Sequence, residues 1–284
     1  MKMIRLPKLL TIGWSHILLE CCSTAEEHDG PVTFDFDKVT WAAPFGLTVI
    51  SVTLAKCLDQ GKDVFYAQPR TKQVSDYLER IGFRYHFLRG ASVEHKKTSV
   101  ELKCLRAVDP GCSEAIVELI ADNLTLTEDA KYEMRTHINE LMTNGFDHSK
   151  SKVGCYVCAQ WYPAKQNLRI SFADGGIGIY QSLRDSGKFP EIHNDEGAIR
   201  LAIKPGITTR KKQLGGFGLD YMRKYVRNND GTLSILSGNA RVNFYTNKIE
   251  SKREPIRFSG TVVDILVSPS KSVGLKRKSK NDLF

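Results

Sequence analysis

The chain has 284 residues, of which 41% are hydrophobic and 26% are charged, and its formal net charge is +9. This size allows one large domain or two modest domains with cores of their own. The seven cysteines are scattered along the chain, which excludes the disulfide framework of a small secreted protein.

Segment 9–22 is the most apolar stretch near the start, but it is too short to span a membrane and contains His16 and Glu20. Basic residues precede it, as they would in a signal peptide. Its apolar core is broken, however, and no small-residue cleavage site follows. We therefore expect no membrane contact and a cytoplasmic location.

The first part of the chain alternates between strand-like and helix-like patterns. Residues 32–36 alternate as a strand, 44–58 form an apolar run of helical length, and 64–67 are predicted to be a second strand. Helical spacing follows over 71–81, and 83–88 are predicted to form a third strand. This order predicts a small α/β unit.

Residues 89–100 are polar and aperiodic, so we place a domain boundary there. Helices are then predicted over 112–124 and 128–147. The stretch 180–214 is long, polar and punctuated by Gly and Pro, which is typical of a functional lid. The other predicted elements are strands 153–161 and 168–173, a helical piece at 196–203, a helix over 216–228, and strands 232–236, 241–246 and 261–267.

Glu140 and Asn144 lie one turn apart on the predicted helix 128–147. An apolar face formed by Met134, Ile138, Leu141, Met142 and Gly145 is opposed by a polar face with His137, Glu140, Asn144, Asp147 and His148. Polar helix faces are ordinarily solvated, but His, Asn and Asp are poor helix formers at mid-helix. The Asn144 amide oxygen suits a hard cation, and Glu140 suits activation of a water or hydroxyl.

A glycine-rich segment follows the strand 168–173. It begins with Asp174, whose carboxylate at the strand end can accept hydrogen bonds from an amino group. Gly176 and Gly178 permit backbone angles and close approaches that a side chain would prevent. Taken alone, this segment is equally typical of an ordinary glycine-rich turn.

A second glycine-rich segment contains Gly216 and Gly218 and leads into a helix near Leu219. Free backbone N–H groups and the helix dipole make such a junction an anion site. The run Thr208-Thr209-Arg210-Lys211-Lys212 precedes it and could close over phosphates, although a solvated charge cluster is the commoner meaning. A Rossmann glycine motif fits poorly because no strand leads directly into these glycines.

The remaining motifs have simpler interpretations. Cys155 and Cys158 form the only CxxC, within a strand where residues three apart face opposite sides, so we interpret them as buried thiols rather than a zinc site. Residues 269–284 form a basic tail, which we interpret as a solvated end, with contact to nucleic acid as the alternative.

The ordered motifs resemble the GHKL ATPases, the family of gyrase subunits, heat-shock chaperones, sensor histidine kinases and mismatch-repair ATPases. Glu140-Leu141-Met142-Thr143-Asn144 is similar to the family's N box, and Asp174 through Gly178 to its DxGxG box. Gly216-Phe217-Gly218-Leu219 is similar to its GxGL box, and Gly260-Thr261 to its final GT element. The resemblance covers roughly 105–268 and implies a mixed β-sheet with helices on one face and ATP between them.

The resemblance also implies roles for individual residues. Asn144 would coordinate Mg²⁺, Asp174 would bond the adenine amino group, Glu140 would be the general base, and 180–218 would be the ATP lid. A basic lid residue, Lys211 or Lys212, would reach the γ-phosphate. The full nucleotide-binding set that we expect is Asn144, Asp147, Asp174, Gly176, Gly178, Thr209, Lys211, Lys212, Gly216, Gly218, Leu219 and Thr261.

The N-terminal unit resembles, over a shorter stretch, a STAS domain, the fold of anti-sigma-factor antagonists. The supporting run is 32–39 followed by Ala42-Ala43-Pro44-Phe45-Gly46-Leu47. Switching STAS domains have a phosphorylatable Ser just before the Gly-Leu, where this chain has Pro44 and Phe45. We therefore expect an interaction or dimerisation module rather than a phospho-switch.

We thus expect an α/β chain in which a small STAS-like α/β domain (1–100) is followed by a GHKL (Bergerat) α/β sandwich (101–268) and the tail (269–284). The layout is most similar to that of anti-sigma-factor serine kinases. No phosphoacceptor His precedes the ATPase motifs, and we expect no transducer domain after Ser268.

Three functions remain open. The first is a Mg²⁺-dependent ATPase that drives a regulatory or assembly switch. The alternatives are a serine/threonine protein kinase of the anti-sigma-factor type and a non-catalytic ATP-sensing adaptor. Expected partners are ATP, a protein bound by the STAS-like domain, and a second copy in a homodimer.

Overall fold

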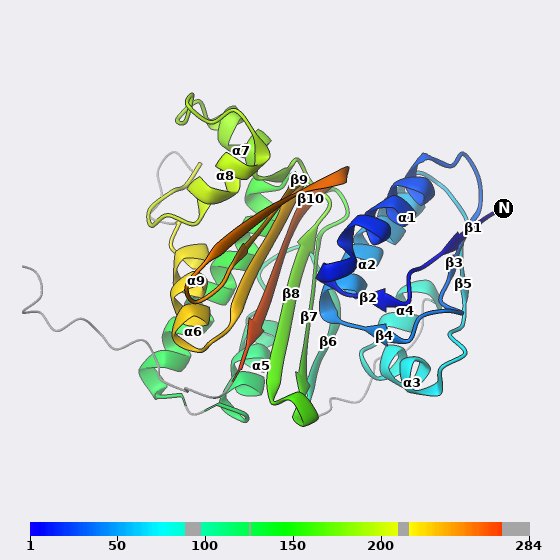
Figure 1. The fold of residues 1–284 in the computed structure, drawn as a ribbon, viewed down its shortest axis with the longest axis horizontal. Helices are drawn as coiled ribbons and strands as arrows, with labels where there is room; N and C mark the ends of the chain where they lie inside the picture. Colours follow the sequence, from blue (N-terminus) through cyan, green and yellow to red (C-terminus); the bar gives the residue numbers. More distant parts are fainter. Residues whose placement is uncertain (89–97, 125, 210–215, 269–284) are drawn as a thin grey trace, which may run out of the picture.

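The computed structural model describes residues 1–88, 98–124, 126–209 and 216–268, and a layer of helices separates its two larger sheets (Figure 1). The smaller sheet belongs to the N-terminal unit and the larger one to the C-terminal part. Within the described residues, every helix is too short or too polar to cross a membrane.

The N-terminal unit is built on a parallel sheet of order β1-β3-β5. Its strands are β1 (Lys2–Arg5), β3 (Val32–Asp35) and β5 (Val64–Ala67). Helices α1 (Ser15–Glu27) and α2 (Pro44–Asp59) connect them, as parallel strands require. The other elements are β2 (Leu9–Leu10), which pairs with β4 (Trp41–Ala42), the 3₁₀ turn η1 (Ile12–Trp14), α3 (Lys72–Arg80) and α4 (Phe83–Leu88).

The prediction of a third strand over 83–88 is wrong, because these residues form helix α4. A six-residue run of mixed apolar and polar residues does not separate a strand from a short helix by its periodicity. The third strand of the parallel sheet is instead β1, at the N-terminus, which was not predicted. Helix α1 was also not predicted from the apolar segment 9–22.

The C-terminal part is built on a five-stranded sheet of order β6-β7-β8-β10-β9. All four strand pairings between its described residues are antiparallel, which corrects the expected mixed sheet. Short turns join β7 to β8 and β9 to β10, and such turns can only produce antiparallel neighbours. The strands are β6 (Ser99–Leu105), β7 (Cys155–Tyr162), β8 (Asn167–Asp174), β9 (Thr232–Phe244) and β10 (Ile249–Val267), with the 3₁₀ turn η3 (Pro163–Lys165) between β7 and β8.

Three helices cover one face of this sheet: α5 (Pro110–Ala121), α6 (Glu128–Thr143) and α9 (Gly218–Asn228) (Figure 1). Helix α6 begins where its sequence predicts, because the Thr127 hydroxyl accepts a hydrogen bond from the backbone N–H of Ala130 at 3.2 Å. The apolar stripe of α6 is buried against the sheet, as the helical periodicity predicted.

The opposite face of the five-stranded sheet is covered by the N-terminal unit. Residues of α1 and α2 share one hydrophobic cluster with the sheet residues Tyr156, Cys158 and Val262. A buried hydrogen bond of 2.9 Å joins the hydroxyls of Thr48 on α2 and Ser171 on β8. The two parts of the chain therefore share a core, although a polar stretch separates them in sequence.

The CxxC pair lies on β7 as expected. Cys155 is buried in the cluster on the α6 side of the sheet, and Cys158 is buried in the cluster on the α2 side. Both cysteines are free thiols. No group of three or more His, Cys, Asp or Glu that could hold a metal ion occurs among the described residues.

The described part of the stretch 180–214, which is 180–209, contains more helix than predicted. It includes most of α7 (Gly178–Ser186), which was missed, and all of α8 (Asp195–Ala202), which was predicted. Asp195 links α8 to strands β9 and β10. Its carboxylate accepts hydrogen bonds from the Arg257 guanidinium at 2.8 Å and from the Asn239 backbone N–H at 3.2 Å. Within the described part of the expected lid, irregular structure is therefore found in the loops on either side of α8 and in the residues that lead to α9.

Candidate functional site

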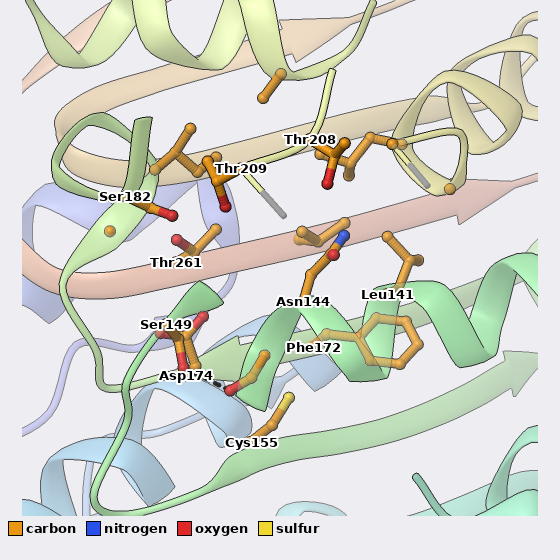
Figure 2. A pocket seen from close by; sticks show the side chains of 18 of the residues that line it. Leu141, Asn144, Ser149, Cys155, Phe172, Asp174, Ser182, Thr208, Thr209 and Thr261 are labelled. Atoms are coloured by element: carbon orange, nitrogen blue, oxygen red, sulfur yellow. Dashed lines mark hydrogen bonds between the residues drawn. The ribbon is translucent and has the colours of Figure 1, made fainter. Parts of the chain in front are cut away.

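A pocket lies between α6, the end of β8, α7, β10 and the start of α9 (Figure 2). It contains about 870 Å³ of empty space, including the part that opens to solvent. The lining combines apolar side chains, such as Leu141 and Phe172, with several hydroxyl, amide and carboxyl groups.

The helix that carries Glu140 changes its winding directly after these residues. Helix α6 ends at Thr143 and continues as the π-helical turn η2 (Asn144–His148). Asn144 therefore sits at the junction, and Figure 2 shows its side chain pointing into the pocket. Single π-helical turns within helices are often found at functional sites because they redirect side chains.

The Glu140 carboxylate lies at the start of α9 rather than in the pocket lining. Its Oε1 atom accepts hydrogen bonds from the backbone N–H of Gly216 at 2.5 Å and of Phe217 at 3.0 Å. Burial acts to raise the pKa of Glu140, but the nearby His137 and these two N–H groups together lower it below its ordinary value. Glu140 is therefore an anion that occupies the N-terminal end of helix α9.

His137 supports Glu140 from the same helix. Its Nδ1 atom is 3.6 Å from Glu140 Oε2, and its ring stacks on Tyr221 with centroids 4.0 Å apart. Tyr221 belongs to α9, so this stack connects the two helices that contribute Glu140 and its N–H donors. The sequence placed His137 on the polar face, but its aromatic partner lies more than eighty positions later and was not predictable from spacing.

Asp174 is at the opposite end of the pocket from α9 and is buried. Its Oδ1 atom accepts a hydrogen bond from the Gly176 N–H at 2.9 Å. Burial raises the pKa of Asp174 to about 7, although the N–H groups of Gly176 and Thr261 and the charge of Lys56 act in the opposite direction. A buried carboxyl with so few partners has capacity to accept a hydrogen bond from a ligand.

Gly176 allows the chain to turn tightly beyond Asp174. A Cβ at this position would overlap the carbonyl oxygen of Ser149, so only glycine fits. The N–H of Ile177 donates to the same carbonyl at 2.7 Å. The Asp174–Gly178 segment is thereby held against the residues that follow η2.

The structure brings together most of the residues that the motifs predicted. The predicted residues that line the pocket are Asn144, Asp174, Gly178, Thr209, Gly216, Gly218, Leu219 and Thr261. Glu140 and Gly176 contact this lining without being part of it. The side chain of Asp147 and the whole of Lys211 and Lys212 lie outside the described residues.

Several lining residues were not predicted. Ser149 and Ser182 contribute hydroxyl groups, and Leu183 and Ala202 contribute apolar surface from α7 and α8. Ser149 follows the N-box-like residues closely, so its position was available from sequence. The others come from the long stretch 180–214, whose helices place them by tertiary packing alone.

Residues 131–268 match the family of histidine kinase-, DNA gyrase B-, and HSP90-like ATPases. The match contains every pocket-lining residue and ends at the last described residue. The C-terminal part of this chain therefore contains a GHKL-type domain. No curated protein matches the chain significantly.

The residues present fit a magnesium-bound nucleotide. Mg²⁺ in nucleotide sites keeps several waters and takes phosphate oxygens together with few protein ligands, and here the Asn144 amide oxygen would be the protein ligand. The Asn144 amide and the Asp174 carboxyl are both among the polar groups that line the pocket, together with several hydroxyls. When bound, the ion would neutralise phosphate charge.

Proposed function

We propose that this chain binds ATP with Mg²⁺ in this pocket and hydrolyses it as a nucleotide-driven regulatory or assembly switch. The observation that supports the proposal most strongly is the pairing of Glu140 with the backbone N–H groups of Gly216 and Phe217. These N–H groups form an anion site that already holds a carboxylate. Phosphate oxygens are also anionic hydrogen-bond acceptors, so the same N–H groups can bind them.

In this proposal each residue has a distinct task. Asp174 accepts a hydrogen bond from the adenine amino group, and Asn144 holds the metal ion. The N–H groups of the Gly216–Gly218 segment receive phosphate oxygens. Glu140, once displaced from them, loses two of the contacts that lower its pKa and becomes a better base toward an attacking water.

A non-catalytic nucleotide sensor is the second candidate. It is favoured by the lowered pKa of Glu140, which makes the side chain a weak base as long as it stays bound to Gly216 and Phe217. In this case ATP would change the position of the α9 start without being cleaved. Transfer of phosphate to a serine or threonine of a protein, as in anti-sigma-factor kinases, is the third reaction to be distinguished.

The deciding experiment incubates purified protein with γ-labelled ATP and Mg²⁺ and follows labelled phosphate and labelled protein separately. The variants are Glu140→Gln and Asn144→Ala, and the control is Glu128→Gln at the exposed start of the same helix. We expect Glu140→Gln to slow release of phosphate by roughly 100-fold or more, because positioned bases contribute 10²–10⁴.

Each result selects one function. Phosphate release that depends on Glu140 supports the ATPase. Label on an added STAS-containing partner supports the kinase, and ATP binding with neither product supports the sensor. Turnover that survives Glu140→Gln unchanged would overturn the assignment of the base, and absence of ATP binding would overturn the whole proposal.

The N-terminal unit remains STAS-like only as a prediction from sequence. A protein partner for this unit, homodimerisation and a cytoplasmic location are proposals of the same kind. Nucleic acid contact through the tail falls outside the described residues, because 269–284 are not among them.

A further inference from the structure

The N-terminal unit reaches the Asp174 end of the pocket through the charged side chain of Lys56. Lys56 belongs to the last turns of α2, on the sheet face opposite to the helices α6 and α9. Its side chain is only 14% exposed. A buried ammonium needs partners, and those of Lys56 indicate what it does.

Lys56 contacts the part of β10 where the register with β9 shifts, just before the β10 residues that pair with Asp174 and the rest of β8. Its ammonium donates a hydrogen bond to the backbone carbonyl of Ser259 at 2.8 Å. Gly260 follows directly, and an added Cβ there would overlap the Asp174 carbonyl oxygen. Thr261 is then the register partner of Asp174 on β8. The ammonium thus fixes the strand segment that flanks the Asp174 carboxyl.

Lys56 also packs against the segment on the other side of Asp174. A Cβ at Gly175 would lie 2.9 Å from Cε of Lys56 and 3.0 Å from Cγ1 of Val52, both on α2. These distances are shorter than ordinary Cβ contacts, so α2 touches the glycine segment without space for a larger residue. One helix of the N-terminal unit therefore contacts both backbone segments that hold Asp174.

Lys56 acts on Asp174 through its positive charge as well as through its packing. Among the described side chains, the ionisable groups that interact with the Asp174 carboxyl are Lys56 from α2 and Cys155 from β7. The positive charge of Lys56 opposes the effect of burial and favours ionised Asp174. Glu26 on α1 lies 3.5 Å from the Lys56 ammonium and partly neutralises it.

We propose that Lys56 is a positioning residue for the nucleotide pocket, through which the N-terminal unit controls the Asp174 carboxyl and so the affinity for the adenine base. This inference rests on the proposed function. A movement of α2 caused by a partner of the N-terminal unit would reach the base-binding end of the pocket directly, because no other element lies between Lys56 and Gly175.

The test compares Lys56→Met, Lys56→Arg and Glu26→Gln with wild type. The control is Lys62→Met, which removes another partly buried lysine of the N-terminal unit whose ammonium donates to the carbonyls of Ala25 and Glu26. Affinity for Mg²⁺–ATP is measured by calorimetry from pH 5.5 to 8.5. The Asp174 carboxyl is titrated without nucleotide by carbon NMR, with Asp174→Asn for assignment.

We expect Lys56→Met to weaken ATP binding at pH 7 roughly threefold to tenfold and to move the Asp174 titration to higher pH, because loss of a nearby positive charge favours the protonated carboxyl. Lys56→Arg should restore both properties, since it retains the charge. Glu26→Gln should move the titration to lower pH, and Lys62→Met should change neither.

The outcomes separate the inference from the proposed function. If wild type binds ATP and Lys56→Met binds it with the same affinity and pH dependence, the inference is wrong and the proposed function stands. If wild type does not bind ATP, the proposed function fails, and the NMR titration decides whether Lys56 controls Asp174. A titration that is equal in wild type, Lys56→Met and Glu26→Gln overturns that control.

Discussion

The Glu140 carboxylate accepts a hydrogen bond of 2.5 Å from the backbone N–H of Gly216, which lies 76 positions later in the chain. The same oxygen also accepts from Phe217, at the start of α9. An acidic side chain thus occupies the position where the motifs predict phosphate. In the proposed function, Glu140 and a nucleotide phosphate compete for the same N–H groups.

This competition predicts that Glu140→Ala binds ATP more tightly than wild type. Hydrogen bonds to a charged group contribute about 1.5–3 kcal/mol, so their removal from the competing state should increase affinity roughly tenfold. Calorimetric titration with Mg²⁺–ATP measures the change, and Glu128→Gln provides a control on the same helix. A weaker affinity in Glu140→Ala would show that Glu140 assists binding rather than opposing it.

Asp174 predicts an unusual dependence of stability on pH. Its pKa is raised by burial from 3.8 to about 7 in the folded protein, so between these values the folded state binds more protons than the unfolded state. The contribution of Asp174 therefore destabilises the fold progressively as pH rises from about 4 to about 7, by on the order of 4 kcal/mol in total.

Asp174→Asn removes this dependence, because the amide oxygen can still accept from Gly176 without a charge. We expect the variant to resist urea better than wild type at pH 8 and to differ little at pH 4. The free energy of unfolding from urea titrations at both pH values is the measurement. If the unfolding free energies of Asp174→Asn and wild type differ by the same amount at both pH values, the pKa of Asp174 is not raised in the folded protein.

Gly176→Ala is expected to destabilise the fold by about 1–3 kcal/mol, because the added Cβ overlaps the carbonyl oxygen of Ser149 and the backbone must move. Gly13→Ala is the control, since its Cβ would meet only the Thr11 hydroxyl at 3.8 Å. Urea midpoints compare the two. Equal stability of both variants would show that the Asp174–Gly178 segment has room to relax.

A buried ion pair connects the N-terminal unit to the strand pair β9 and β10. Glu254 Oε1 lies 3.2 Å from Arg241 Nε and accepts from the Ser15 hydroxyl of α1 at 2.7 Å. Glu254→Ala leaves the Arg241 charge buried without its partner, so we expect a loss of about 3–5 kcal/mol of unfolding free energy.

Two further variants test the origin of that loss. The double variant Arg241→Met, Glu254→Met should recover much of the stability, because it removes both buried charges. Glu250 is on the same strand as Glu254 and forms an exposed ion pair with Lys248. Glu250→Ala breaks this pair and should lower the unfolding free energy by less than about 1 kcal/mol. A similar loss in Glu254→Ala and Glu250→Ala would contradict the burial argument.

Much of the site was predictable because its motifs are local. Glu140 and Asn144 are one turn apart, so helical periodicity alone places them together opposite the apolar stripe. Asp174 and Gly176 are two residues apart at a strand end, and Gly216 and Gly218 precede a helix. These short spacings determine local geometry, and the structure places Asn144, Asp174, Gly216 and Gly218 in the pocket lining, with Glu140 and Gly176 in contact with it.

The errors occurred where local pattern leaves two conformations open. Residues 83–88 suit a strand or a short helix equally, and tertiary packing of Phe83 into the N-terminal core accompanies the helix. Helix α7 was missed because its polar residues resemble a loop. The antiparallel sheet differs from the mixed sheet that the resemblance implied, since strand direction depends on connections and not on composition.

The amino-acid sequence by itself determined that the C-terminal part contains ordered nucleotide-site motifs on a helix, a strand end and a helix start. Hydrophobic periodicity and glycine placement act over a few residues, so they can be recognised without the fold. Only the tertiary structure decided that Glu140 binds the α9 start and that Lys56 of the N-terminal unit contacts the Asp174 segments. Those contacts join residues that are 76 or more positions apart, and only the packing of complete elements brings them together.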